Sequence, residues 1–130
     1  VGVFSLDGIV RFYRPNEKGL GSLSATNLTY SDISLEAPVK RIQTIMADLK
    51  HKKIDYLKID IEGAEHGVIQ DMLFSGIEPD QLGVEFDMPT PPWVVEKTIR
   101  GLLLAGYEIV AIWGLNCLFA KTDVIDSARG

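Results

Sequence analysis

Four acidic residues stand at the ends of two short apolar runs of the sequence. Asp60 and Glu62 come at the end of the run near residues 54–61, and Glu85 and Asp87 come at the end of the run at residues 81–86. In an open α/β sheet, ligands bind at the carboxyl ends of the parallel strands. A carboxylate placed there can orient a substrate hydroxyl and accept its proton. Asp60, Glu62 and Glu85 are therefore the predicted catalytic residues, and Asp87 is a predicted substrate-binding residue.

Three further side chains near these acids are predicted to bind substrate. Lys58 alternates with Asp60 and Glu62, so the three share one face of a strand, where a buried lysine needs a cleft or an ion pair. His66 falls in the first turn of the following helix, where it could act as a base or simply lie on the surface. Trp93 is either a pocket-lining residue or a core residue.

Each acidic residue also has a structural explanation that the sequence leaves open. Asp60 and Glu62 precede a predicted helix, whose N-terminus favours negative charge. Together with Glu85 and Asp87 they offer the oxygen ligands that hard cations prefer. Their spacing does not require a metal, and we expect none.

The elements that must position these residues alternate between strand and helix. The β-branched run at residues 54–61 predicts a buried strand, and a helix with one apolar face follows Gly63. Residues 81–86 predict a second strand, and a helix then runs from the proline cluster to Gly106. The last two strands, at residues 107–113 and 116–121, are separated by two residues only, too few for a parallel crossover. We therefore expect an α/β sheet that ends in an antiparallel hairpin.

The N-terminal third of the sequence gives weaker signals. Asp7-Gly8 predicts a hairpin between residues 1–6 and 9–13, and residues 14–37 predict a mostly irregular connection. A strand is expected to run into Ile42, followed by a short helix capped by Thr44. Residues 1–122 are expected to form part of one domain, and residues 123–130 a loose tail.

Composition narrows the classes of partner. The chain has 130 residues, of which 46% are hydrophobic, and a net charge of -5 without a basic cluster, so we expect no nucleic-acid partner. Its longest apolar stretches are far shorter than the roughly 20 residues of a membrane span. The one cysteine, Cys117, fits a reducing compartment, and we expect a cytoplasmic domain.

The string Lys-Ile-Asp-Ile-Glu-Gly-Ala-Glu at residues 58–65 resembles the signature of the FkbM methyltransferases. Residues 1–15, Val84-Glu85 and Gly106-Tyr107 resemble other segments of that family. The resemblance implies the C-terminal part of a class I, Rossmann-like methyltransferase sheet flanked by helices. It also implies methyl transfer from S-adenosylmethionine to a hydroxyl of a sugar or natural product. The glycine-rich turn that binds the cofactor is expected upstream of Val1.

Two other hypotheses remain open at this stage. The domain could be a non-catalytic module with a methyltransferase-like fold, or a metal-dependent hydrolase that uses Asp60 and Glu62. We expect a small hydroxylated molecule as partner, a lid over the pocket at residues 87–93, and self-association through an open sheet edge.

Overall fold

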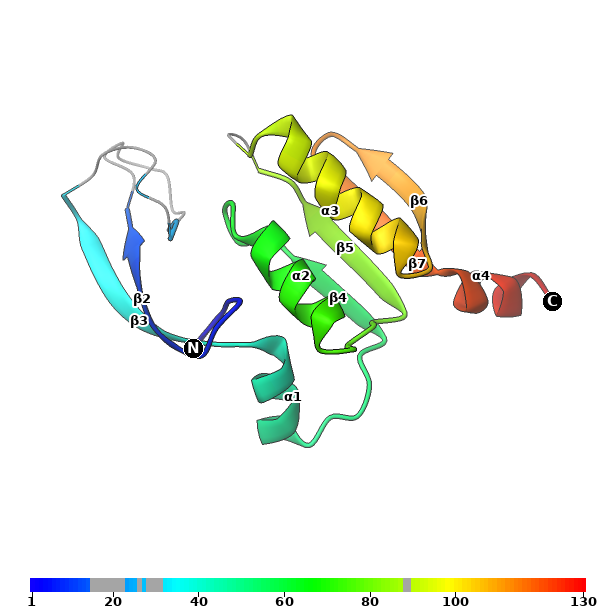
Figure 1. Ribbon diagram of the computed structural model, residues 1–130, viewed down its shortest axis with the longest axis horizontal. Helices are drawn as coiled ribbons and strands as arrows, with labels where there is room; N and C mark the ends of the chain where they lie inside the picture. The colour runs from blue at the N-terminus through cyan, green and yellow to red at the C-terminus, as the bar shows by residue number, and fades with distance from the viewer. Residues whose placement is uncertain (15–22, 26, 28–31, 88–89) are drawn as a thin grey trace.

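The computed structural model describes residues 1–14, 23–25, 27, 32–87 and 90–130 (Figure 1). The described residues form two sheets and a set of helices. In chain order the elements are β1 (Gly2–Val3), β2 (Gly8–Tyr13), β3 (Ser34–Lys40), α1 (Ile42–Leu49), β4 (Tyr56–Ile59), α2 (Glu65–Phe74), β5 (Gln81–Glu85), α3 (Pro92–Leu104), β6 (Tyr107–Trp113), β7 (Asn116–Lys121) and α4 (Thr122–Arg129).

The main sheet has the strand order β4-β5-β7-β6. β4 and β5 are parallel, with Ile59 opposite Val84, so both strands end at the same edge of the sheet. β7 runs antiparallel to β5 on one side and to β6 on the other. The predicted hairpin of β6 and β7 is confirmed, with β7 inserted between β5 and β6.

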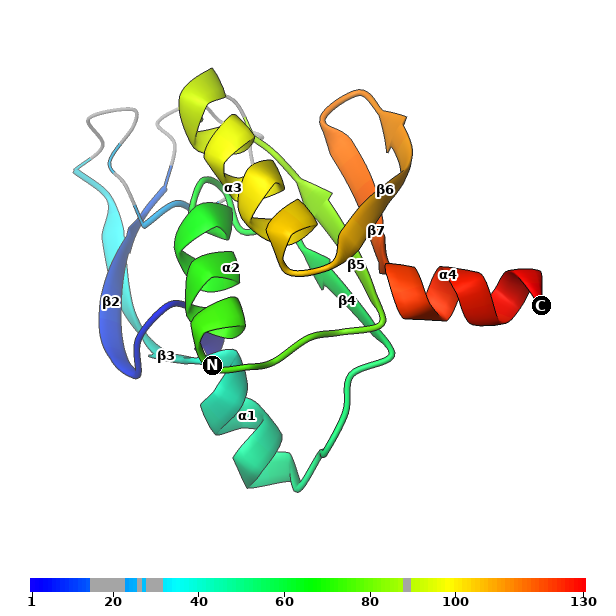
Figure 2. The ribbon, with the colours of Figure 1, turned by 45° about the vertical axis from the view of Figure 1, so that its right-hand side comes forward.

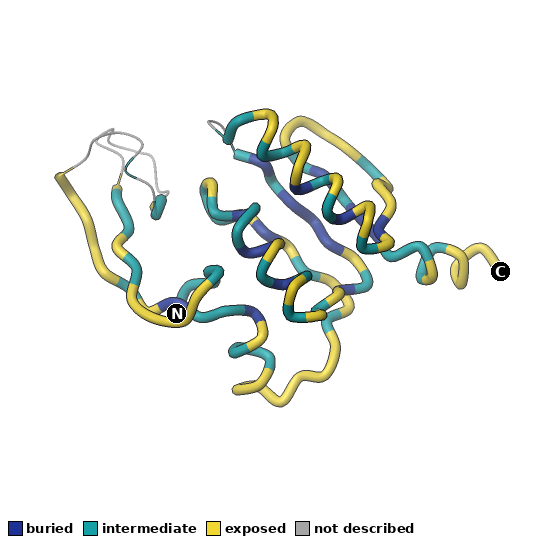
Figure 3. Tube along the Cα trace, in the orientation of Figure 1, coloured by how far each residue is buried: buried dark blue, intermediate teal, exposed yellow. Residues whose placement is uncertain are grey.

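Helices α2 and α3 lie side by side over one face of the main sheet (Figures 1 and 2). Their apolar faces pack on β4, β5 and β7 because the inward side chains of a buried sheet need an apolar cover. Figure 3 shows β5 as an almost continuous buried segment beneath exposed outer helix faces. The buried core consists of Ile42, Ile59, Val68, Ile69, Met72, Leu82, Val84, Phe86, Leu102, Tyr107, Cys117 and Phe119.

The second sheet has the strand order β1-β3-β2 and stands beside the first (Figure 1). β2 pairs antiparallel with β3, and β1 pairs parallel with β3. The hairpin predicted across Asp7-Gly8 is therefore wrong, because the strands on either side of that turn both pair with β3. The Asp7 carboxylate instead accepts hydrogen bonds from the Arg41 backbone N–H and the Thr44 hydroxyl.

The helices also differ from the sequence-based predictions in two places. Helix α1 begins at Ile42, two residues before the predicted cap, because Thr44 donates its hydroxyl to Asp7 instead of capping the helix. The tail at residues 123–130, expected to be loose, lies almost entirely in helix α4, which has no buried residues and projects from the sheet (Figure 2). A carboxylate in the first turn of α4, Asp123, and a basic residue in its last turn, Arg129, both suit the helix dipole.

The α/β class predicted from the sequence is confirmed. No helix in the described part of the chain is both long and apolar enough to cross a membrane.

Candidate functional site

The parallel strands β4 and β5 bring Asp60 and Glu85 to one edge of the main sheet. Lys58 lies between them, with its Nζ 3.4 Å from a Glu85 carboxylate oxygen and 4.0 Å from an Asp60 oxygen. The same ammonium donates to the side-chain oxygen of Asn116 on β7 at 3.3 Å. The structure thus brings together three of the predicted site residues, Lys58, Asp60 and Glu85, and Asn116 joins them without having been predicted.

Lys58 is not buried as its place in an apolar run had suggested. Its side chain is 40% exposed, because the neighbouring Ile59 points into the helix-covered core and Lys58 points to the opposite face. Gly83 on β5 gives it room, since a Cβ atom there would lie 3.3 Å from Lys58 Cδ and 2.6 Å from the Tyr56 hydroxyl. A glycine in the middle of β5 therefore lets Lys58 reach Glu85 and Asn116.

Glu62 does not join that cluster, because β4 ends at Ile59 and a tight turn follows. Glu62 and Gly63 both have positive φ angles, of 54° and 97°. A left-handed conformation at a non-glycine residue is uncommon and needs support from its surroundings. The alternation of a strand therefore stops before Glu62, and the face that it was expected to share with Lys58 does not extend that far.

Glu65 supports the turn, and sequence reasoning missed this role. Its side chain is 98% buried, and Oε1 accepts hydrogen bonds from the backbone N–H groups of Ile61 and Gly63 at 3.1 and 3.0 Å. The available signal was a glutamate in the first helical turn, two residues after a turn glycine, which can reach back to unpaired backbone N–H groups. Glu65 therefore fixes the backbone that carries Glu62.

Glu62 and His66 both line a cavity of about 430 Å³ beside the turn. The cavity lies between the chain after β1, the start of α2 and the start of α3, and most of its surface is apolar. Burial raises the pKa of Glu62, and the charges of Asp60, Glu65 and Glu85 raise it further. The full lining is Phe4, Ser5, Glu62, Gly63, Ala64, His66, Gly67, Thr90, Pro91 and Val94.

His66 is held from one side by Thr98 of helix α3. Its Nδ1 lies 2.5 Å from the Thr98 hydroxyl, which in turn is 2.8 Å from the carbonyl oxygen of Val94. Burial lowers the pKa of His66, and the neighbouring charge of Lys97 lowers it further. The ring is thus favoured in its neutral form. Thr98 gave no signal in the sequence, because a threonine on the buried face of a helix is ordinary.

Asp87 follows β5 and carries an unusual carboxyl group. Its Oδ2 atom is buried and has no hydrogen-bond partner among the described residues. Burial raises the pKa of Asp87 to about 6, and the charges of Glu62, Glu65, Asp60 and Glu85 act in the same direction. Asp87 is therefore close enough to the other carboxylates for their charges to affect its ionisation.

Trp93 lies apart from the other predicted site residues. It is 71% exposed on α3 and contributes to a shallow hollow with Glu96, Lys97 and Arg100. The lid predicted at residues 87–93 includes residues 88 and 89, which lie outside the described residues.

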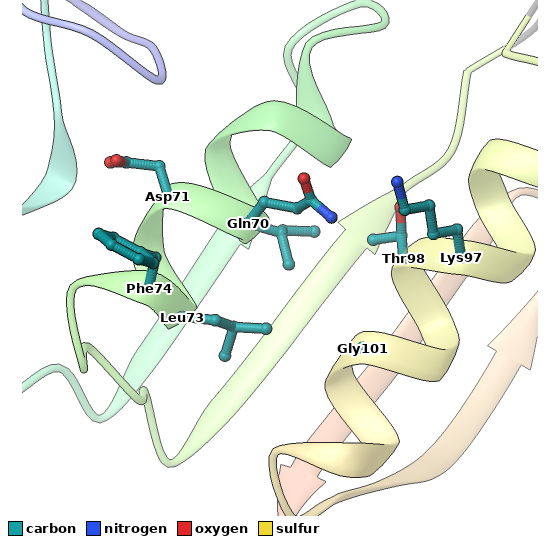
Figure 4. Close-up of a pocket in the computed structure, with 8 residues that line it drawn as sticks. Gln70, Asp71, Leu73, Phe74, Lys97, Thr98 and Gly101 are labelled. Atoms are coloured by element: carbon teal, nitrogen blue, oxygen red, sulfur yellow. The ribbon is translucent and has the colours of Figure 1, made fainter.

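A larger hollow, of about 640 Å³, lies between the outer faces of α2 and α3 (Figure 4). It involves the C-terminal half of α2, including Leu73 and Phe74, and the middle of α3. This hollow contains none of the acidic residues that follow β4 and β5. We therefore place the candidate site at the strand ends and in the smaller cavity beside them.

Metal ligation has no direct support at this site. Among the residues that the structure describes, no group of three or more histidine, cysteine or acidic side chains is arranged to hold a metal ion.

Comparison with known families gives one finding. The model of the family described as "Methyltransferase FkbM domain" matches residues 10–109, which include both β4 and β5 and the turn that carries Glu62. No curated protein and no solved structure matches the chain significantly. Because the match extends over most of the sequence, the chain belongs to the FkbM methyltransferase family.

Proposed function

We propose that this domain transfers a methyl group from S-adenosylmethionine to a hydroxyl of a small acceptor, such as a sugar or another natural product. The observation that carries the proposal is the position of the carboxylates in a chain of this family. Asp60 and Glu85 follow neighbouring parallel strands, and Glu62 lines the adjoining cavity. This edge is where an α/β sheet binds its ligands.

The electrostatics of the edge suit a cationic cofactor. Burial raises the pKa of Glu62 and Asp87, the charges of the neighbouring carboxylates raise it further, and Asp87 Oδ2 has no partner among the described residues. A positive charge placed there would relieve this repulsion. S-adenosylmethionine carries a sulfonium cation, and when bound it would supply the methyl group.

The chain's own contribution is to orient the acceptor and take its proton. A carboxylate within hydrogen-bond reach of the hydroxyl can fix its direction and accept its proton as the oxygen attacks. Asp60 is half exposed at the strand end, and Glu62 reaches into the cavity, so these two are the proposed proton acceptors. Glu85, fixed by Lys58, is the proposed orienting group.

The proposal predicts binding of S-adenosylmethionine and transfer of its labelled methyl group. Titration calorimetry should use this chain and a version extended at its N-terminus, where we expect the cofactor's glycine-rich turn. We expect the extended form to bind and to methylate a member of a panel of neutral saccharides and hydroxylated natural products. Failure of both forms to bind the cofactor would contradict the proposal.

Matched variants identify the carboxylates that act. Asp60→Asn and Glu62→Gln keep the side-chain shape, and loss of the proton acceptor should lower the transfer rate about 10²- to 10⁴-fold. Asp55→Asn is the control, because Asp55 precedes β4 at the opposite end of the strand and its side chain is 88% exposed. If the domain is a non-catalytic module, Asp60→Asn and Glu62→Gln should change the transfer rate no more than Asp55→Asn does.

A further inference from the structure

The contact between His66 and Thr98 defines where the imidazole carries its proton. The Thr98 hydroxyl has one hydrogen and lies within hydrogen-bond distance of two groups, His66 Nδ1 at 2.5 Å and the Val94 carbonyl oxygen at 2.8 Å. Both contacts can be hydrogen bonds in one arrangement only: a carbonyl oxygen only accepts, so the hydroxyl donates its hydrogen to Val94. The hydroxyl oxygen must then accept from His66, which places the ring proton on Nδ1.

The surroundings leave Thr98 little freedom to reverse this arrangement. Thr98 also contributes to the hollow between α2 and α3, but it is 98% buried, so bulk water has little access to it. Burial and the charge of Lys97 lower the pKa of His66, which favours the neutral ring. A neutral imidazole with a proton on Nδ1 has a lone pair on Nε2.

The Nε2 atom is the part of the ring left for a ligand. Within the described residues it has no protein hydrogen-bond partner, and His66 lines the cavity of about 430 Å³. Glu62 is the other ionisable group in that lining, and its carboxylate also accepts hydrogen bonds. The apolar remainder of the wall includes Phe4, Pro91 and Val94.

We propose that Thr98 is a positioning residue that holds His66 in the Nδ1–H tautomer, so that His66 can only accept a hydrogen bond from a ligand, through Nε2. Taking that ligand to be the methyl acceptor rests on the proposed function, whereas the tautomer itself does not. A hydroxyl or amine on the ligand satisfies Nε2. A carbonyl or ether oxygen in the same place would face a lone pair, so the cavity selects donors and discriminates against ligands that only accept.

Nitrogen-15 NMR of the histidine rings tests the proposal directly, because a protonated and an unprotonated ring nitrogen of neutral imidazole differ widely in chemical shift. The chain has two histidines, and the other, His51, is exposed and serves as the internal reference. A His51→Gln variant assigns the signals. Above the pKa of His66 we expect its proton on Nδ1, and a proton on Nε2 would overturn the proposal.

Two variants of Thr98 distinguish positioning from simple packing. Thr98→Val keeps the shape of the side chain but removes the hydroxyl, so the ring should lose its preference for the Nδ1–H form. Thr98→Ser keeps the hydroxyl and should retain that preference. An unchanged tautomer in Thr98→Val would overturn the proposal. If Thr98→Val does not fold, the wild-type measurement still tests the tautomer, and a ring proton on Nε2 would still overturn the proposal.

The outcome is independent of whether the domain transfers methyl groups. In the form that binds S-adenosylmethionine, Thr98→Val should leave the cofactor affinity within about twofold of the wild-type value, while KM for a hydroxyl acceptor rises about tenfold, or about 1.4 kcal/mol. Absence of methyl transfer would contradict the proposed function, and the NMR signature would still test the role of Thr98. An unchanged KM alongside a changed tautomer would overturn the role of Nε2 in acceptor binding.

Discussion

At the scale of single residues, the carboxyl of Asp87 links ionisation at the site to folding. Its pKa in the folded protein is about 6, above the ordinary value of 3.8. Between these two values the folded state holds the proton more tightly than the unfolded state does. The free energy of unfolding therefore falls as pH rises through this window, and the loss is complete above about pH 6.

Asp87→Asn removes this penalty while keeping the size of the side chain. At pH 8 we expect the variant to be more stable than the wild type by about 1–2 kcal/mol, less than the full linkage of about 3 kcal/mol because the side chain is partly exposed. Well below pH 3.8 the difference should vanish, since the wild-type carboxyl is then protonated in both states. Urea denaturation at the two pH values measures both differences. A variant that is less stable at pH 8 would contradict the expectation.

At the scale of elements, the turn between β4 and α2 depends on a buried clamp. Glu65→Ala would leave the backbone N–H groups of Ile61 and Gly63 without their acceptor in a partly buried turn. We expect a loss of about 2–4 kcal/mol in the free energy of unfolding. Glu65→Gln is the matched control, because an amide oxygen can accept the same two bonds, and it should cost less than about 1.5 kcal/mol. If Glu65→Ala and Glu65→Gln lowered the free energy of unfolding equally, the charge of Glu65 and not its hydrogen bonds would be responsible.

The elements that the sequence predicted well are those set by local pattern. The bounds of β6 and β7 match the prediction, because two residues between apolar strands leave only an antiparallel hairpin. β4, α2, β5 and α3 were also anticipated from their periodicity. The wrong predictions depend on contacts between distant parts of the chain. Asp7 bonds to Arg41 and Thr44, more than thirty residues away, and no local pattern encodes that pairing.

At the candidate site, too, the sequence predicted what depends on local pattern and missed what depends on contacts between distant residues. The sequence placed Asp60 and Glu85 at one edge, since strand ends can be located from an apolar run, and it selected Glu62 and His66. It did not show that Glu62 turns away from Lys58, because the positive φ angle depends on the clamp by Glu65. Thr98 comes from a helix 32 residues after His66 in sequence, so their contact needed the fold.

At the scale of the whole molecule, Arg41 connects the segment that follows the smaller sheet to helix α2 on the larger one. Its Nε and Nη2 atoms bond to the Asp71 carboxylate at 3.0 and 2.6 Å, and Nη2 also donates to Ser75. The side chains of Arg41 and Asp71 are 30% and 16% exposed. A two-atom contact of this kind, partly shielded from water, is stronger than a surface ion pair.

A double-mutant cycle measures this connection. With Arg41→Gln and Asp71→Asn, singly and together, we expect a coupling energy of about 1–3 kcal/mol from urea denaturation. The exposed pair of Lys53 and Asp55, with side chains 61% and 88% exposed, is the control. Its coupling should stay below about 1 kcal/mol. Similar coupling energies for the two pairs would show that the Arg41–Asp71 contact stabilises the protein no more than an exposed ion pair does.

The position of β7 sets an order of events for the nascent chain. β7 is the last strand of the main sheet to be synthesised, yet it lies between β5 and β6 and brings the fully buried Phe119 to the core. Until it emerges from the ribosome, β6 has no partner within the main sheet and one edge of β5 stays open. Pairing β5 with a strand about 35 residues later is also slower than closing a local hairpin. Until β7 has been synthesised, the partly folded domain therefore exposes apolar surface to which chaperones can bind.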